Sequence, residues 1–129
     1  MRKNPIRILL VDDNTVTRSL LRGILRGDEY EVVGEASDGG QGLELALRLQ
    51  PEIICLDIEI PGTSGLDMLP KLREQLPNTV VLMVTGHTDR EMVQAAVQGG
   101  AAGYIIKPFN AAKVLDNLSS ALNKVRARL

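Results

Sequence analysis

Five short apolar segments, each separated from the next by a stretch with helical periodicity, constrain the fold of this chain more than any other feature. They are rich in β-branched residues and cover residues 6–11, 32–36, 53–57, 80–85 and 103–107. Three of them are apolar almost throughout, which is typical of central strands in a parallel sheet covered on both faces. The second contains Gly34 and Glu35, so we expect it to be an edge strand.

The stretches between and after these segments predict five helices. The second and third cover about residues 41–49 and 66–76, and the third ends before Pro77. The fourth covers residues 89–98 and ends at Gly99-Gly100, where a left-handed glycine can terminate a helix. The fifth begins after Pro108 and runs to the C-terminus. This alternation predicts an α/β fold, a doubly wound parallel sheet with right-handed crossovers, whose site forms beyond the carboxyl ends of the strands.

The first helix, over about residues 16–25, carries two kinds of side chain. We interpret its row of arginines as a solvated face; the row consists of Arg18, Arg22 and Arg26. Its apolar residues share another face and are Val16, Leu20, Leu21, Ile24 and Leu25.

Composition argues against several classes of function. The 15 basic and 16 acidic residues nearly cancel, which is unlike a nucleic-acid-binding surface, and an aromatic content of 2% disfavours base stacking. No apolar run approaches the roughly 18 residues of a membrane span, and the first residues lack the apolar region of a secretory leader. The single cysteine, Cys55, cannot form an internal disulfide and is expected to be a small buried hydrophobe. We therefore expect a cytoplasmic protein that contacts neither nucleic acid nor membrane.

Polar residues with complementary chemistry stand at the ends of four of the predicted strands. Asp12 and Asp13 follow the first strand, Asp57 ends the third, Thr85 ends the fourth and Lys107 ends the fifth. Neighbouring strands lie about 4.8 Å apart, so the three carboxylates would lie close together if the first and third strands are neighbours. Each pair of charges at ~5 Å repels by roughly 3 kcal/mol at an effective dielectric near 20, so a cation or protons must compensate.

Magnesium is the natural cation for such a set, because it prefers oxygen ligands and usually completes its coordination with a phosphoryl oxygen. Lys107 could then neutralise a second phosphoryl oxygen, and the Thr85 hydroxyl could bond a third. Asp57, centred among these groups, is the candidate nucleophile that forms an aspartyl phosphate.

The chain resembles the receiver domains of two-component response regulators in four motifs, in order and with the family's spacing. Residues 8–14, Ile-Leu-Leu-Val-Asp-Asp-Asn, resemble the opening acidic pair of that family. Residues 53–57 with Pro61-Gly62 and Gly65-Leu66 resemble the phosphoacceptor strand and its loop. Residues 84–86 resemble the switch hydroxyl, and residues 100–109 resemble the closing lysine-proline motif.

This resemblance implies a single receiver domain over residues 1–129, with a flavodoxin-like sheet in the order 2-1-3-4-5 and five helices. It implies that Asp13, Asp57 and the Glu59 backbone carbonyl bind magnesium, with Asp12 helping through water. It also implies a cis peptide bond between Lys107 and Pro108. Tyr104 would turn inward when Thr85 closes on the phosphoryl group.

The function implied is a signalling module rather than an enzyme, catalysing at most its own phosphorylation and dephosphorylation. A sensor histidine kinase or a histidine phosphotransfer protein would donate the phosphoryl group to Asp57. An output domain or partner protein would then bind the face formed by the fourth helix, fifth strand and fifth helix. Two alternatives stay open: a haloacid-dehalogenase-like phosphatase, echoed by Asp57-Ile58-Glu59, and a degenerate receiver that signals without phosphate.

Two further features concern the lifetime of the phosphoryl group and the assembly of the protein. Glu59 and His87 each lie two residues beyond a site residue, so they could pair as a lid that hinders water at the phosphorus atom. In the opposite hypothesis, Glu59 orients the attacking water. The last helix has a 4-3-4-3-4 spacing typical of a coiled-coil seam, which predicts a possible homodimer; the seam is Ala111, Leu115, Leu118, Leu122, Val125 and Leu129.

Overall fold

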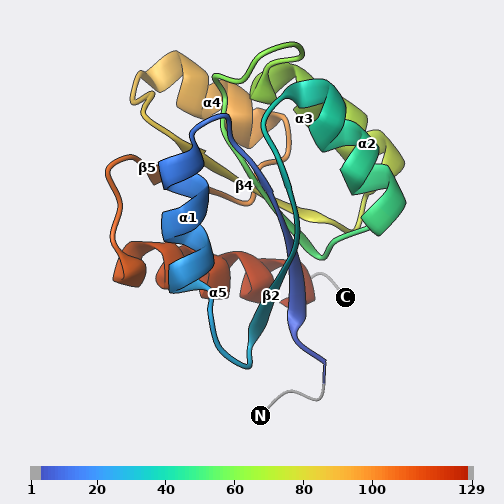
Figure 1. The fold of residues 1–129 in the computed structure, drawn as a ribbon. Coiled ribbons are helices and arrows are strands. Elements are labelled where there is room, and N and C mark those ends of the chain that lie inside the picture. Colours follow the sequence, from blue (N-terminus) through green and yellow to red (C-terminus); the bar gives the residue numbers. More distant parts are fainter. Residues whose placement is uncertain (1–3, 128–129) are drawn as a thin grey trace.

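The computed structural model describes residues 4–127 of the chain, in which five strands alternate with five helices (Figure 1). In chain order these are β1 (Ile6–Val11), α1 (Thr15–Ile24), β2 (Tyr30–Ala36), α2 (Gly39–Leu49), β3 (Ile53–Leu56), α3 (Gly65–Gln75), β4 (Val80–Thr85), α4 (Arg90–Gln98), β5 (Gly103–Ile106) and α5 (Ala111–Ala127).

The strands form one parallel sheet in the order β2-β1-β3-β4-β5, as predicted. The direction of the connections reverses between β1 and β3, because β1 leads through α1 to β2 on one side and β3 leads through α3 to β4 on the other. In doubly wound sheets a ligand site forms at this switch point. The edge position of β2 is also confirmed. The topology therefore brings the ends of β1 and β3, and with them the predicted acidic residues, side by side.

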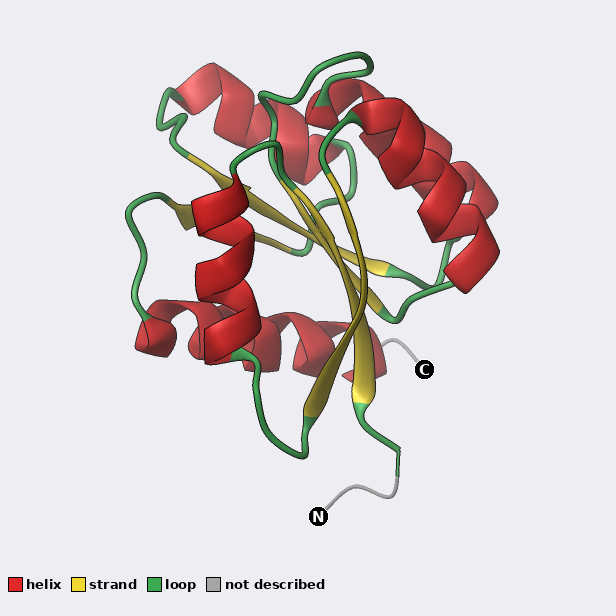
Figure 2. Ribbon diagram, viewed as in Figure 1, coloured by secondary structure: helices red, strands yellow, loops and turns green. Residues whose placement is uncertain are grey.

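Two hydrophobic layers enclose the sheet, with α1 and α5 on one face and α2, α3 and α4 on the other (Figure 2). Alternate residues along each central strand contribute to opposite layers; in β1, Ile8 and Leu10 pack toward α1 and α5, whereas Leu9 and Val11 pack toward α2 and α3. Cys55 is a small buried hydrophobe in the first layer, as predicted, and burial raises its pKa to about 12.

Several predicted boundaries shift. β2 begins two residues earlier than predicted, and β3 and β5 each end one residue earlier, so Asp57 and Lys107 stand just beyond their strands. Helix α2 begins at Gly39 because the Asp38 side chain accepts a hydrogen bond from the Gln41 N–H and caps the helix. Helix α4 is likewise capped by the Asp89 side chain, which therefore precedes the helix rather than opening it.

The glycine pair that terminates α4 is confirmed, whereas the apolar face of α1 is buried only in part. Gly99, the C-cap of α4, is right-handed with φ −75°, and the left-handed conformation falls on Gly100 with φ +101°. In α1, Leu21 and the capping residue Leu25 are buried, but Val16 is 66% exposed and Leu20 is 55% exposed. The apolar face of α1 is thus only partly covered, because the sheet beneath it accommodates one narrow stripe of the helix.

Two remaining predictions concern the backbone and the membrane. The peptide bond between Lys107 and Pro108 is cis, as the resemblance implied. Within residues 4–127, every helix is too short or too polar to cross a bilayer.

Candidate functional site

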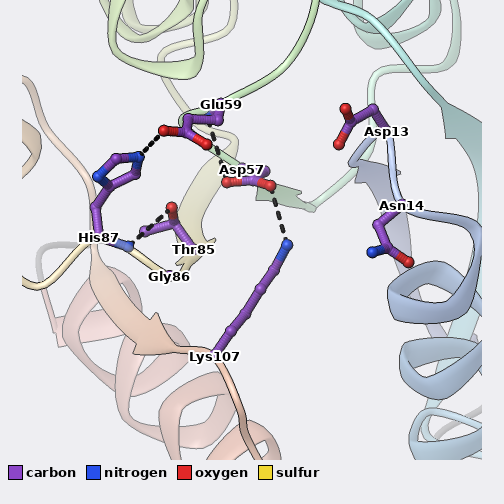
Figure 3. A pocket seen from close by; sticks show the side chains of 8 residues that line it. All are labelled: Asp13, Asn14, Asp57, Glu59, Thr85, Gly86, His87 and Lys107. Carbon is purple, nitrogen blue, oxygen red and sulfur yellow. Dashed lines mark hydrogen bonds and ion pairs between the residues drawn. The ribbon is translucent and has the colours of Figure 1, made fainter.

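The carboxyl ends of the central strands open into a cleft of about 420 Å³, which contains most of the predicted site residues (Figure 3). The cleft is lined by Asp13, Asn14, Asp57, Glu59, Thr85, Gly86, His87 and Lys107. These residues come from the ends of β1, β3, β4 and β5. The sheet topology thus brings together residues that lie up to 94 positions apart in the sequence.

Three carboxylates converge at one side of the cleft. Asp12, Asp13 and Asp57 each offer an oxygen, and these oxygens all lie within 4.8 Å of one another. Asp12 and Asp57 are buried, whereas Asp13 is exposed to solvent. Three hard oxygen donors, one of them open to water, fit the ligand preference of Mg²⁺, which retains several waters in protein sites.

Lys107 supplies the positive charge nearest to this group. Its Nζ donates to Asp12 Oδ2 at 2.8 Å and to Asp57 Oδ2 at 3.0 Å. Burial by itself would lower the Lys107 pKa, but the hydrogen bonds and charges of Asp12 and Asp57 outweigh burial and raise it. The pKa of Asp12 is raised by burial, although the Lys107 hydrogen bond opposes the shift. Lys107 therefore remains an ammonium ion at neutral pH and compensates part of the negative charge.

The local backbone holds the acidic residues in place. The Asp12 side chain accepts a hydrogen bond from the Asn14 N–H at 2.8 Å, and the Asn14 side chain caps α1 by accepting from the Thr17 N–H at 3.1 Å. The Asp57 N–H continues the ladder to the Val11 carbonyl at 3.0 Å, so Asp57 stays aligned with β1. One Asp57 carboxylate oxygen accepts from the Glu59 N–H at 3.3 Å and the other from Lys107.

Thr85, His87 and Tyr104 form a short chain of contacts on the other side of the cleft. Thr85 is fully buried, and its hydroxyl oxygen accepts a hydrogen bond from the His87 N–H at 3.4 Å. The Tyr104 hydroxyl donates to the His87 carbonyl at 2.9 Å, so the half-buried ring lies against the loop that follows β4. Burial and the negative charges of Asp89 and Asp57 raise the Tyr104 pKa.

Glu59 and His87 meet across the mouth of the cleft, as their sequence positions suggested. The His87 ring Nε2 contacts Glu59 Oε1, and Figure 3 shows the two side chains pointing toward each other beside Asp57. The His87 side chain is 25% exposed and that of Glu59 is 74% exposed, so the pair lies at the solvent boundary.

The sequence did not identify three residues that the structure places in or next to the site. Asn14 and Gly86 line the cleft, and Arg18 donates to the Asp12 backbone carbonyl. The adjacency of Asn14 to the acidic pair could have indicated a helix cap. Arg18 was interpreted as solvated, but its side chain is only 17% exposed, so that interpretation is wrong for this residue.

Comparison with known proteins agrees with this geometry. A family model described as response regulator receiver domain matches residues 8–119. The chemotaxis protein CheY of Thermotoga maritima is 34% identical over 119 residues, which cover 92% of this chain and 96% of CheY. The nitrate/nitrite response regulator protein NarL of Escherichia coli is 37% identical over 120 residues, 92% of this chain and 56% of NarL. The structure of a CheY-like receiver domain protein from Methanospirillum hungatei aligns with a TM-score of 0.89 and 29% identity, covering 98% of this chain and 100% of that one.

Proposed function

This chain belongs to the response regulator receiver family of two-component signalling, and from that membership we propose that Asp57 is its phosphoryl acceptor. The observation that carries the proposal is the position of Asp57. It is buried just beyond a central strand, hydrogen-bonded to Lys107 and clustered with Asp12 and Asp13. The module relays a signal rather than turning over a separate substrate, and we propose that residues 1–129 act as one receiver unit.

In the proposed reaction, an Asp57 oxygen attacks the phosphorus of a phosphohistidine on a kinase or phosphotransfer protein. The new P–O bond forms as the P–N bond to the donor histidine breaks, and the donor imidazole takes up a proton. Lys107 then exchanges its bond to Asp57 for a phosphoryl oxygen, and the Thr85 hydroxyl approaches another. Asp13, Asp57 and the Glu59 carbonyl would hold Mg²⁺, with Asp12 helping through water, and the ion would neutralise charge on the transferring oxygens when bound.

We propose that the output partner binds the face formed by α4, β5 and α5, because the chain of contacts from Thr85 reaches β5. Thr85 is linked to His87, and His87 to Tyr104 on β5. A movement of Thr85 toward a phosphoryl group would therefore change the position of the Tyr104 ring. An output domain, a separate partner or a second copy of this chain would bind there, and a cytoplasmic setting suits the phosphodonor.

The acceptor is tested by incubation with acetyl phosphate and Mg²⁺. We expect one base-labile phosphoryl group per chain, seen as a mass shift, and we expect Asp57→Asn to abolish it. Asp67→Asn, which changes an exposed carboxylate on α3, serves as the matched control and should label like the unchanged protein. Equal labelling of Asp57→Asn would refute the assignment, and sustained turnover of p-nitrophenyl phosphate would favour the phosphatase alternative.

A further inference from the structure

Arg18 on α1 connects the acidic loop to the edge strand β2. Its Nη1 donates to the Asp12 backbone carbonyl at 2.5 Å, and its Nε donates to Glu35 Oε1 at 3.0 Å. Arg22, one helical turn further on, pairs with the other oxygen of the same carboxylate at 3.2 Å, but its side chain is 50% exposed. Both arginines therefore hold Glu35, and within residues 4–127 Arg18 is the one of the two that also donates to Asp12.

A β-bulge in β2 is the reason that Glu35 faces α1. Ile8 of β1 is in register with Val32, but the next residue, Leu9, is in register with Gly34, so one residue is inserted at Val33. Without this insertion the alternation along β2 would turn Glu35 toward α2. With it, Glu35 is in register with Leu10, whose side chain packs on the α1 and α5 face. Bulges commonly redirect a side chain in this way next to functional sites.

The end of β2 consequently holds Asp12 by both of its backbone groups. The Asp12 N–H donates to the Ala36 carbonyl at 3.0 Å, and the Asp12 carbonyl accepts from Arg18, which Glu35 orients. The first bond holds the peptide plane before the Asp12 Cα atom, and the Arg18 bond holds the peptide plane after it, between Asp12 and Asp13. Among residues 4–127, the Asp13 carboxylate has no hydrogen-bond or ion-pair partner, so its direction depends on that plane.

We propose that Arg18 is a positioning residue for divalent-cation binding, held in place by Glu35 and acting on the Asp12–Asp13 peptide. This inference rests on the proposed function, since it takes Asp12, Asp13 and Asp57 as the cation ligands. Groups that orient metal ligands without touching the metal commonly change the metal affinity by about 10–100-fold. Arginine suits the role because its planar fork donates in two fixed directions at once, which a lysine cannot do.

The sign of the effect separates positioning from simple electrostatics. Arg18 carries a positive charge beside an acidic site, so removing that charge should strengthen Mg²⁺ binding if Coulomb repulsion dominates. If Arg18 acts by orienting the Asp12–Asp13 peptide, its removal should weaken binding instead. Arg22→Gln removes the same charge from the same helix and the same Glu35 pair but leaves the Asp12 carbonyl bond in place.

The experiment is a calorimetric titration of the full chain with MgCl₂ alone, without any phosphodonor. We expect Arg18→Gln to raise the Kd about tenfold, whereas Arg22→Gln keeps it unchanged or lowers it slightly. Arg18→Lys should give an intermediate Kd, and Glu35→Ala combined with Arg18→Gln should be no worse than Arg18→Gln alone, because the two act as one unit. In phosphorylation by acetyl phosphate, Arg18→Gln should raise the half-saturating Mg²⁺ concentration while the rate at saturating Mg²⁺ stays close to that of the unchanged protein.

An equal or lower Kd for Arg18→Gln, with the unchanged protein binding Mg²⁺, would overturn the positioning role and leave the proposed function intact. Failure of the unchanged protein to bind Mg²⁺ would refute the cation site of the proposed function and this inference with it. Circular dichroism of each variant shows whether it is folded. If Arg18→Gln is not, the comparison of Arg18→Lys with Arg22→Lys decides, and equal Kd values for that pair again overturn the role.

Discussion

Glu59 and His87 form the one contact that spans the mouth of the cleft in residues 4–127, and their proposed role is to control water access to phosphorylated Asp57. We expect Glu59→Ala and His87→Ala to shorten the lifetime of the aspartyl phosphate, because either change opens the lid. The effect should be at most about fivefold in rate, since a pair this exposed is worth less than ~1 kcal/mol. The decay of the phosphorylated species by mass spectrometry measures it.

The double variant and an exposed control make this test specific. Glu59→Ala combined with His87→Ala should decay like either single variant, because one contact is lost in all three. Glu44→Ala, which alters an exposed carboxylate on α2, should decay like the unchanged protein. A longer lifetime for Glu59→Ala would support the opposite role, orientation of the attacking water, and unchanged rates in both single variants would exclude the lid.

The start of α3 is packed directly against Asp57, the proposed phosphoacceptor, and one glycine permits this approach. A Cβ atom added at Gly65 would lie 2.2 Å from the Asp57 carbonyl oxygen, and the Gly65 N–H donates to the Ile58 carbonyl at 3.0 Å. We expect Gly65→Ala to lower the free energy of unfolding by about 1–3 kcal/mol and to slow phosphorylation, because either α3 or Asp57 must move. Urea unfolding and acetyl phosphate labelling measure the two effects.

Gly23, in the last turn of α1, is the matched control for that substitution. A Cβ atom there would have no neighbour within 4 Å, and the residue is helical with an ordinary negative φ. Gly23→Ala should therefore raise the free energy of unfolding by up to about 1 kcal/mol, because alanine is the better helix former, and should leave phosphorylation unchanged. If both variants behaved alike, close packing at Gly65 would not be the cause.

The rest of the protein covers α5 only in part, so some positions of the expected coiled-coil seam are buried in the protein's own core and others are exposed. Leu118 is fully buried and Leu122 packs against the same core, so these two positions serve the protein's own sheet, whereas Leu115 is 37% exposed. The seam positions Val125 and Leu129 lie outside the residues whose side chains are described. The exposed part of α5 is consequently the candidate contact for a second copy of the chain.

We expect beryllofluoride, a stable phosphoryl mimic, to promote a dimer that Leu115→Glu disrupts. A charge placed in an apolar contact must be desolvated, so the dissociation constant should rise at least about tenfold. Leu47→Glu is the control, because Leu47 is also 37% exposed but lies on α2, which covers the opposite face of the sheet. Sedimentation velocity gives the mass, and monomers for every protein with and without beryllofluoride would contradict self-association through α5.

The sequence by itself determined the class of fold and which residues gather at the carboxyl ends of the strands. Strand and helix periodicities of 2 and 3.6 residues are local properties of the backbone, so alternating segments are visible without the tertiary structure. The carboxyl ends of parallel strands all lie at one edge of the sheet, so the residues that directly follow the strands in the sequence must converge there. Asp12, Asp57, Thr85 and Lys107 were found in this way, and the structure brings Asp12 and Asp57 to a common Lys107.

Only the tertiary structure decided how those residues are supported. Whether Glu35 faces α1 or α2 depends on a one-residue register shift between β1 and β2, two strands whose pairing no local pattern specifies. The exposure of Val16 is a second example. The helical pattern places Val16 on one face with Leu21 and Leu25, but Val16 is exposed because it lies past the edge of the stripe that the sheet covers. Such outcomes depend on contacts between segments distant in the chain, where a shift of one residue exchanges the two faces of a strand.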